Sequence, residues 1–314
     1  MTGSHPLQPS FRPLRVRVPG STSNLGPGFD FAGLALSIYL DVEVLGPSNT
    51  PHHEFERLTG TAADWPVGPE NLLLRALERG SQELGTQAAP LRFAVHSEIP
   101  VARGLGSSGA AITAGLVLSN AIAHRAPTLD RWLALALEIE GHPDNTSASI
   151  AGGCTLAVPD DEQGVCLVRQ ELHRDLAFAI AWPEQRLSTR QARSVLPREV
   201  SFADAVENPR RLALLLEGLR SANVKMLKLG AEDRLHVKHR LALIPSGALA
   251  LEAARGSGAW FASVSGSGSA LFAIAARDRI EDVARAMQRG LEASGPAQCR
   301  VVEAVMHAAR VEHA

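Results

Sequence analysis

The sequence contains very little lysine. Of its 31 basic residues only three are lysines, Lys225, Lys228 and Lys238, and none of them follows a glycine. A P-loop requires a Gly-Lys pair whose lysine reaches the β- and γ-phosphates, and a protein kinase requires a lysine on a strand shortly after its glycine-rich loop. Both classes are therefore excluded. If this protein binds phosphates, it has to use backbone amides, arginines, hydroxyl groups and metal ions.

Cysteine and long apolar runs are also scarce. The chain of 314 residues has three cysteines and no C-x-x-C pair, so neither a disulfide framework nor a zinc site is expected. It has no apolar run of about 18 residues, and its first 12 residues contain no apolar stretch, so we expect neither a membrane span nor a signal peptide. The formal net charge of −2 provides no field that would attract nucleic acid or an acidic membrane. We therefore expect a cytoplasmic protein.

Segments typical of strands and helices are intermixed along the chain. Alternating apolar residues predict strands at 14–18 and 91–98, and an apolar segment predicts a helix at 108–123. The two kinds of element do not alternate strictly, which favours an α+β fold over a doubly wound sheet. The chain is long enough for two domains, and a shift in composition near residue 160 predicts domains of residues 1–160 and 161–314.

A glycine-rich turn lies between the second of these strands and the helix. It reads P-V-A-R-G-L-G-S-S-G from Pro100 to Gly109. Glycine permits positive φ and lets a phosphate approach the main chain, while the first amides of a helix lack an intrahelical acceptor and carry the positive end of its dipole. Such a turn is an anion site that needs no lysine. Ser107 and Ser108 can cap the helix, donate to a phosphate or ligate Mg²⁺, and a tight turn with a serine N-cap explains the pattern equally well.

Two other polar segments are rich in carboxylates and amides. Residues 19–30 (PGSTSNLGPGFD) follow the first strand, and residues 140–145 (EGHPDN) end one helix and begin another. Taken alone, Asn24 and Asp30 are typical turn-stabilising residues. Glu140 could end a helix in solvent, yet one carboxylate with a serine hydroxyl and phosphate oxygens also suits Mg²⁺, which keeps several waters and few protein ligands.

Arginines and a second glycine turn occupy the C-terminal half. Residues 188–193 (STRQAR) are typical of a capped helix start, and Arg240 lies in the segment DRLHVKHR. A guanidinium fork suits a carboxylate better than a lysine does, although each arginine is also compatible with an ordinary surface position. Residues 263–270 (SVSGSGSA) lie between two predicted strands and by themselves predict a hairpin turn.

Together these segments resemble the motifs of the GHMP kinases, and most closely those of the homoserine kinase family. Residues 100–109 resemble the motif that wraps the ATP phosphates, residues 19–30 the first homoserine kinase motif, and residues 263–270 the third motif of the superfamily. The first motif commonly reads P-A-S-S-A-N, where this chain has P-G-S-T-S-N. The resemblance covers nearly the whole chain and implies the GHMP kinase fold, with an N-terminal domain like ribosomal S5 domain 2 and a ferredoxin-like C-terminal domain.

The resemblance further implies an enzyme that uses ATP and Mg²⁺ to phosphorylate the side-chain hydroxyl of L-homoserine, a step toward threonine. It allows a homodimer. Asn71, at a predicted helix start, is a candidate for an adenine contact. By resemblance, the residues that contact ATP phosphates are those of the glycine-rich turn: Pro100, Arg103, Gly104, Leu105, Gly106, Ser107, Ser108 and Gly109.

The same resemblance assigns roles to polar side chains. Ser107 and Glu140 would hold Mg²⁺. Asn145 would orient the attacking hydroxyl, and Asp144 is the nearest candidate for a base, unless the hydroxyl proton passes to the phosphate. Arg193 and Arg240 would bind the substrate carboxylate and Asp30 its ammonium group. The residues expected to bind homoserine are Asn24, Asp30, His142, Thr189, Arg193 and Arg240.

Two other functions are compatible with parts of this pattern. A GHMP kinase for mevalonate, a shikimate-like or an isoprenoid alcohol would share the phosphate loop but would not require an ammonium partner together with a carboxylate clamp. A nucleotide-binding relative without activity should lose Glu140 or the substrate arginines, which this chain retains. Mevalonate kinases and galactokinase-like members typically read P-G-[KR] after the first strand, where this chain has Pro19-Gly20-Ser21. The scarcity of lysine therefore favours homoserine kinase.

Overall fold

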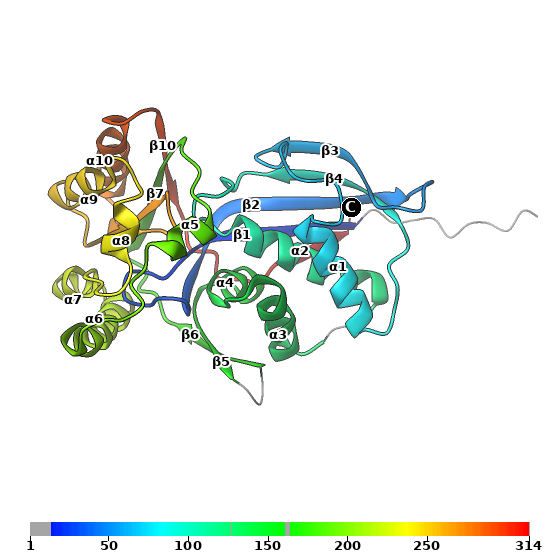
Figure 1. Cartoon of the computed structure of the whole chain (residues 1–314), viewed down its shortest axis with the longest axis horizontal. Helices are drawn as coiled ribbons and strands as arrows, with labels where there is room; N and C mark the ends of the chain where they lie inside the picture. Colours follow the sequence, from blue (N-terminus) through cyan, green and yellow to red (C-terminus); the bar gives the residue numbers. More distant parts are fainter. Residues whose placement is uncertain (1–13, 126, 161–163, 314) are drawn as a thin grey trace, which may run out of the picture.

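The structure is a computed structural model that describes residues 14–125, 127–160 and 164–313. The first 12 residues, for which no signal peptide is expected, lie outside these ranges. Within them, no helix is long and apolar enough to cross a membrane. Two sheets, each covered by helices, lie next to each other along the long axis of the molecule (Figure 1). The α+β fold expected from the sequence is confirmed.

The first sheet is built mainly from the N-terminal half of the chain. Its strands are β1 (Leu14–Ser23), β2 (Ala32–Pro47), β3 (Glu54–Gly60), β4 (Leu91–Ser97) and β11 (Arg310–His313), in the order β11-β1-β2-β4-β3. All neighbours are antiparallel except β3 and β4. The pairing of β1 with β2 continues past a register shift at Pro19 and Gly20, so half of the segment that the sequence presents as a turn is strand.

A hairpin of β5 (Cys154–Asp160) and β6 (Gly164–Gln170) extends this sheet through pairing of β5 with the start of β2. The predicted domain boundary at residue 160 therefore falls inside a hairpin, and the chain changes sheet only after Gln170. Composition could not show this, because the sheet that a strand joins depends on its pairing partners. In addition, β11 returns to pair with β1, so the first sheet also includes the C-terminal strand.

Four helices cover one face of the first sheet (Figure 1). They are α1 (Leu72–Glu83), α2 (Ser107–Ala123), α3 (Leu129–Glu140) and α4 (Asp144–Ala151). The predicted apolar helix at 108–123 is α2, and it lacks a polar face because β1, α1, α3 and α4 all pack against it. At Gly115, a Cβ atom would overlap the Leu73 carbonyl oxygen of α1, so this glycine permits the close approach of the two helices.

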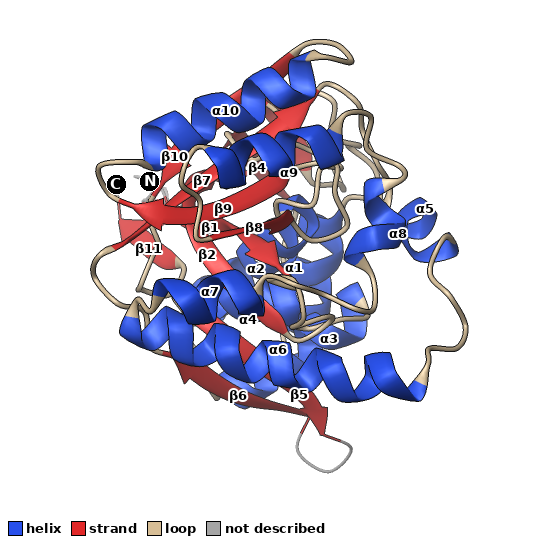
Figure 2. Ribbon diagram, turned by 90° about the vertical axis from the view of Figure 1, so that its left-hand side faces the viewer, coloured by secondary structure: helices blue, strands red, loops and turns tan. Residues whose placement is uncertain are grey.

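The second sheet is fully antiparallel and has the order β10-β7-β9-β8. Its strands are β7 (Leu176–Pro183), β8 (Phe261–Val264), β9 (Leu271–Ala276) and β10 (Ala297–Val302). Helices α9 (Gly247–Gly256) and α10 (Ile280–Glu292) pack against it (Figure 2). This order of strands and helices is that of a ferredoxin-like domain, as expected.

Four further helices lie in the long connection between β7 and α9. They are α5 (Thr189–Ser194), α6 (Phe202–Ser221), α7 (Val224–Gly230) and α8 (Val237–Leu241). Ser188 caps α5 in a capping box with Gln191, which confirms the capped helix start predicted for this segment.

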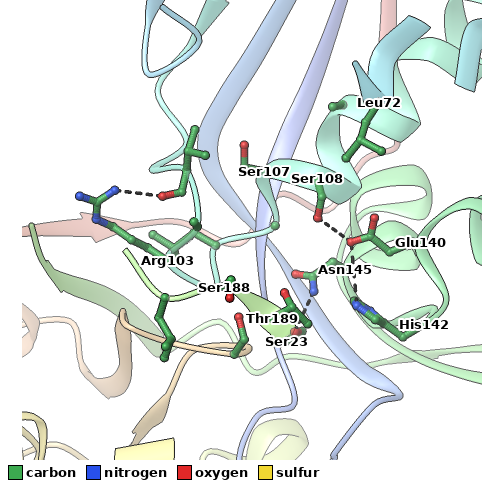
Figure 3. A pocket seen from close by; sticks show the side chains of 18 of the residues that line it. Ser23, Leu72, Arg103, Ser107, Ser108, Glu140, His142, Asn145, Ser188 and Thr189 are labelled. Atoms are coloured by element: carbon green, nitrogen blue, oxygen red, sulfur yellow. Dashed lines mark hydrogen bonds and ion pairs between the residues drawn. The ribbon is translucent and has the colours of Figure 1, made fainter. Parts of the chain in front are cut away.

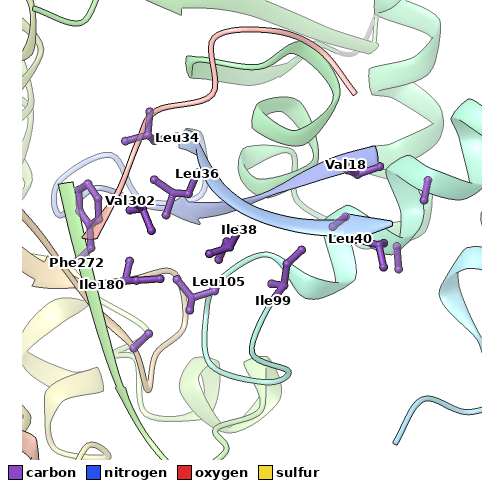
Figure 4. Packing of buried hydrophobic residues seen from close by; sticks show 14 of the residues in the cluster. Val18, Leu34, Leu36, Ile38, Leu40, Ile99, Leu105, Ile180, Phe272 and Val302 are labelled. Carbon is purple, nitrogen blue, oxygen red and sulfur yellow. The ribbon is translucent and has the colours of Figure 1, made fainter. Parts of the chain in front are cut away.

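One hydrophobic cluster joins the two sheets. Leu36 and Ile38 of β2 belong to the same buried cluster as Ile180 of β7 and Phe272 of β9, and Leu105 of the glycine-rich turn is part of it (Figure 4). The side chain of Leu105 is 1% exposed. The turn is thus anchored in the core at the junction of the sheets, while the glycines and serines around Leu105 remain at the surface of a cavity.

Candidate active site

A cavity of about 410 Å³ lies where these elements meet, within the range typical of small-molecule sites. It is lined by the turn after β1, the start of α1, the glycine-rich turn, the segment between α3 and α4, and residues of α5 and α8. Of the predicted site residues, only Gly109 does not line the cavity. It lies within α2 and packs against Asn145 of α4. The cavity is lined by the predicted residues Asn24, Asp30, Asn71, Pro100, Arg103, Gly104, Leu105, Gly106, Ser107, Ser108, Glu140, His142, Asp144, Asn145, Thr189, Arg193 and Arg240.

Hydrogen bonds hold three distant turns together at this cavity. The Ser21 amide donates to the Leu105 carbonyl oxygen at 3.1 Å. The Ser265 hydroxyl, in the turn between β8 and β9, lies 2.7 Å from the Gly104 carbonyl oxygen and 2.8 Å from the Thr22 hydroxyl. The three glycine- and serine-rich segments of the sequence therefore form one surface.

The glycine-rich turn presents unpaired amides to the cavity. Gly104 and Gly106 both have φ of 73°, the left-handed conformation that favours glycine. Gly106 is the N-cap of α2 and has no side chain, so no side-chain hydrogen bond caps the helix. The serine N-cap that the sequence allowed is therefore not formed. The first amides of α2 remain available to an anion, with the positive end of the helix dipole behind them.

The serine that approaches Glu140 is Ser108, whereas the sequence analysis paired Ser107 with this carboxylate. The Ser108 hydroxyl donates to Glu140 Oε1 at 2.5 Å, and the side chain of Ser107 points away from it (Figure 3). Successive residues of a helix point about 100° apart, and position 108 is the one that faces α3. Burial raises the pKa of Glu140, although the hydrogen bond from Ser108 opposes this shift.

His142 and Asp144 form a buried pair beside Glu140. His142 Nδ1 lies 2.8 Å from Asp144 Oδ1, and His142 Nε2 lies 4.0 Å from Glu140 Oε1. Burial is the largest single effect and disfavours both charges, but the hydrogen bonds and the attraction of nearby opposite charges together outweigh it, so the pKa of Asp144 is lowered and the pKa of His142 is raised. Asp144 is therefore an ionised carboxylate at neutral pH, with a nearby histidine that favours the protonated form.

The side-chain amide of Asn145 is already hydrogen-bonded at both ends. Its Oδ1 accepts from the Ser21 hydroxyl at 2.9 Å, and its Nδ2 donates to the Ser23 hydroxyl at 2.9 Å. It also lies 3.3 Å from Asp144 Oδ1. Asn145 therefore joins α4 to the end of β1, and a contact with an attacking hydroxyl would have to replace one of these hydrogen bonds.

Asp30 and Arg193 face each other across the cavity rim. Arg193 donates through both terminal nitrogens to the two carboxylate oxygens of Asp30, at 2.8 and 2.9 Å. The Asp30 amide donates to Asn24 Oδ1 at 2.9 Å, so Asn24 fixes the turn that carries Asp30. The family resemblance places Asp30 and Arg193 at opposite ends of a ligand and does not predict this ion pair.

Arg240 is buried behind the same turn. It is 1% exposed, and its Nη1 donates to the Gly266 carbonyl oxygen at 2.7 Å. Burial lowers the pKa of Arg240 to about 10, which leaves it charged at neutral pH. Phe29 stacks on His236 with ring centroids 4.8 Å apart and lies 5.1 Å from the guanidinium carbon of Arg240. Phe29 and His236 are thus supporting residues that the sequence analysis did not single out, although both lie within its motifs.

Two of the predicted nucleotide contacts have their polar groups engaged by the main chain. The guanidinium of Arg103 donates to the carbonyl oxygens of Val101, Pro183 and Glu184, which ties the glycine-rich turn to the end of β7. Asn71 is the N-cap of α1, where Oδ1 accepts from two helical amides, and its Nδ2 donates to Pro66 at 2.6 Å. Both side chains line the cavity, but their first role is structural.

Several apolar lining residues had no signal in the sequence. They come from the segment before α1, from the first residue of α1 and from the loop before α5, and no motif in the sequence pointed to them. They bring apolar and aromatic surface to a cavity whose predicted residues are mostly polar, and a base or sugar needs such surface. These residues are Trp65, Pro66, Leu72 and Leu187.

The His142–Asp144 pair makes stability depend on pH. The raised pKa of His142 means that its stabilisation is complete below its ordinary pKa of about 6.5 and is lost as the pH rises through the raised value. The lowered pKa of Asp144 means that its stabilisation is present above about pH 3.9 and is lost as the pH falls further. We therefore expect Asp144→Asn to reduce the free energy of unfolding more at pH 6 than at pH 9, as measured by urea unfolding of both proteins. Equal losses at the two pH values would mean that His142 is neutral in the folded protein.

Comparisons with known proteins agree with this geometry. Residues 71–153 match the model of the GHMP kinases N terminal domain, and residues 212–293 match the GHMP kinases C terminal model. The first match contains the glycine-rich turn, Glu140 and Asn145. The predicted GHMP kinase fold is therefore confirmed, and with it the use of ATP.

Relatives and solved structures extend the match over nearly the whole chain. The homoserine kinase of Synechococcus sp. (strain RCC307) is 39% identical over 282 residues, which cover 89% of this chain and 90% of that protein. The homoserine kinase of Prochlorococcus marinus (strain MIT 9301) is 38% identical, with 90% of each chain covered. A homoserine kinase structure from Cytophaga hutchinsonii has a TM-score of 0.85 at 23% identity and covers 98% of this chain and all of the other, which shows the fold. A mevalonate kinase structure has a TM-score of 0.69 at 13% identity, with 93% of this chain and 99% of the other covered. The chain therefore belongs to the homoserine kinase family of GHMP kinases.

Proposed function

We propose that this protein transfers the γ-phosphoryl group of ATP to the side-chain hydroxyl of L-homoserine, giving ADP and O-phospho-L-homoserine. The observation that carries the proposal is the content of a single cavity. It combines a helix N-terminus with unpaired amides, a carboxylate at Asp30 and two arginines, Arg193 and Arg240. These groups complement a polyphosphate, an ammonium group and a carboxylate, and the similarity to homoserine kinases over 90% of the chain supports the same substrate.

The phosphates would be bound by the first amides of α2. These amides lie after Gly104 and Gly106, which have no Cβ atoms to block their approach to a phosphate. Phosphoryl transfer depends mainly on position and on the stabilisation of charge, so a rigid row of amides suits it. Leu105 holds this row in place, because its side chain lies in the core between the sheets.

Mg²⁺ would be held by Glu140 and Ser108. Both side chains offer oxygen donors, they are already 2.5 Å apart, and burial disfavours a bare carboxylate at this position. The described residues contain no group of three or more His, Cys, Asp and Glu side chains that could hold a metal. Mg²⁺ suits such a sparse site, because it retains waters and phosphate oxygens as ligands. When bound, it would neutralise charge on the transferring phosphoryl group.

Homoserine would bind with its carboxylate at Arg193 and Arg240 and its ammonium group at Asp30. Asn24, His142 and Thr189 line the same cavity. Asp144 would accept the hydroxyl proton. It is ionised at neutral pH, and its Oδ1 is hydrogen-bonded by both His142 and Asn145, which hold it in one orientation. Asn145 would orient the hydroxyl with its side-chain amide, in exchange for one of its hydrogen bonds to Ser21 and Ser23.

Three broader expectations accompany this proposal. The reaction would serve the synthesis of threonine, and we expect the protein to act in the cytoplasm. The homodimer allowed by the resemblance stays a prediction.

The substrate assignment is tested by ADP release, coupled to a spectroscopic readout, with L-homoserine, mevalonate, galactose and shikimate. We expect kcat/KM to be highest for L-homoserine, because only this compound offers an ammonium and a carboxylate to the three charged residues. Turnover of another alcohol together with none of homoserine would assign the protein to a different branch of the superfamily. A chain that binds ATP but turns over none of them would be a nucleotide-binding relative.

The role of Asp144 is tested by Asp144→Asn in the same assay. The amide retains the shape of the carboxylate but does not accept a proton, so we expect kcat to fall by about 10²- to 10⁴-fold. A much smaller decrease in kcat in a folded variant would indicate that the proton passes directly to the phosphate.

The position of the metal is tested by comparing Ser108→Ala with Ser107→Ala. Removal of the hydroxyl beside Glu140 should raise the Mg²⁺ concentration for half-maximal activity by roughly 10- to 100-fold. The Ser107→Ala protein is the matched control, since it removes the same group from the neighbouring position, and its Mg²⁺ requirement should change much less. The reverse order would show that α2 presents Ser107 to the metal.

A further inference from the structure

The ion pair between Asp30 and Arg193 occupies the groups that a substrate would use. Both carboxylate oxygens and both terminal guanidinium nitrogens take part, in a two-pronged geometry that is among the stronger kinds of ion pair. The side chains are 35% and 39% exposed. Asp30 follows β1 and Arg193 lies on α5, so the pair also connects the two halves of the chain. Neither side chain can use all of its charged atoms to bind a ligand until this ion pair opens.

Arg240 is in a different state. Its Nη1 is bonded to the Gly266 carbonyl oxygen and lies 3.3 Å from His236 Nδ1, and within the described ranges no carboxylate forms an ion pair with it. Its Nε is buried without a hydrogen-bond partner. The guanidinium carbons of Arg240 and Arg193 lie 5.1 and 5.9 Å from the ring of Phe29, so both cations border one aromatic side chain. A carboxylate that enters the cavity therefore meets one arginine that has no carboxylate partner and one that is already paired.

The charge on the ligand decides whether opening the ion pair is favourable. A zwitterion replaces one ion pair by two, because its ammonium group binds Asp30 and its carboxylate binds the arginines. A ligand with only one of these charges leaves Asp30 or Arg193 without a partner in a partly buried site, which is unfavourable. We propose that the Asp30–Arg193 ion pair is a specificity filter, which a ligand opens without loss of charge pairing only if it carries both an ammonium group and a carboxylate.

This inference rests on the proposed function. It goes further, because it excludes alcohols that carry only an ammonium group or only a carboxylate. Two such compounds are derived from homoserine. Removal of the ammonium group gives 4-hydroxybutanoate, and removal of the carboxylate gives 3-aminopropan-1-ol. Both retain the hydroxyl group, so they differ from homoserine in charge and size but not in the reacting group.

The test measures dissociation constants for both compounds by NMR titration. Asp30→Asn releases Arg193, so 4-hydroxybutanoate should bind about 5-fold more tightly than to the unmodified protein, the order expected for a partly exposed pair. Arg193→Gln releases Asp30, so 3-aminopropan-1-ol should bind more tightly by a similar factor. Homoserine should bind more weakly to both variants. Each variant tests the filter by itself, so the loss of one through misfolding leaves the other decisive.

Arg190→Gln is the matched control, because Arg190 is an exposed arginine on the same helix and is outside the cavity lining. It should change none of the three constants. If 4-hydroxybutanoate does not bind more tightly to Asp30→Asn and 3-aminopropan-1-ol does not bind more tightly to Arg193→Gln, Asp30 and Arg193 bind independently. The filter is then refuted, whatever the activity of the wild-type protein. If the reciprocal gains appear but the wild type does not phosphorylate homoserine, the filter stands and the proposed reaction is wrong.

Discussion

The active-site geometry depends on one buried hydroxyl group, that of Ser265. It donates to the Gly104 carbonyl oxygen and accepts from the Thr22 hydroxyl, which joins turns that are more than 80 residues apart in the sequence. Leu105 reinforces this junction from below, because its side chain packs in the core shared by the two sheets. The glycine-rich turn is therefore held by contacts from both sheets.

Each charged side chain around the cavity is either paired with another group of the protein or faces the space for the ligand. Asp144 is paired with His142, Glu140 with a serine hydroxyl, and Asp30 with Arg193. Buried charges without partners are costly, and this explains why the ligand-free site satisfies its carboxylates internally. It also gives each expected ligand group a partner to displace. Ligand binding then replaces interactions within the protein by interactions of a similar kind with the ligand. Discrimination between ligands therefore depends on the number of charges that each ligand carries.

The sequence allowed most of the strands and helices to be predicted, because their patterns are local. The helix at 108–123 and the strand at 91–98 were found within a few residues. The boundary at residue 160 stays a prediction, and the chain changes sheet later, after Gln170, since which sheet a strand joins depends on its partner and not on its own composition. The sequence likewise could not show which of Ser107 and Ser108 faces Glu140, because the rotation of α2 about its axis is fixed by its packing against α1, α3 and the sheet.

By itself the sequence determined the chemistry of this protein. The near absence of lysine, the glycines that permit left-handed turns, and the motif residues predicted an ATP site built from amides and a substrate pocket with carboxylates and arginines. Only the tertiary structure decided how these groups pair. Asp30 and Arg193 are 163 residues apart, and nothing local to either residue indicates that they meet. Hydrogen bonds and ion pairs across such separations form only after the core between the sheets has brought the turns together.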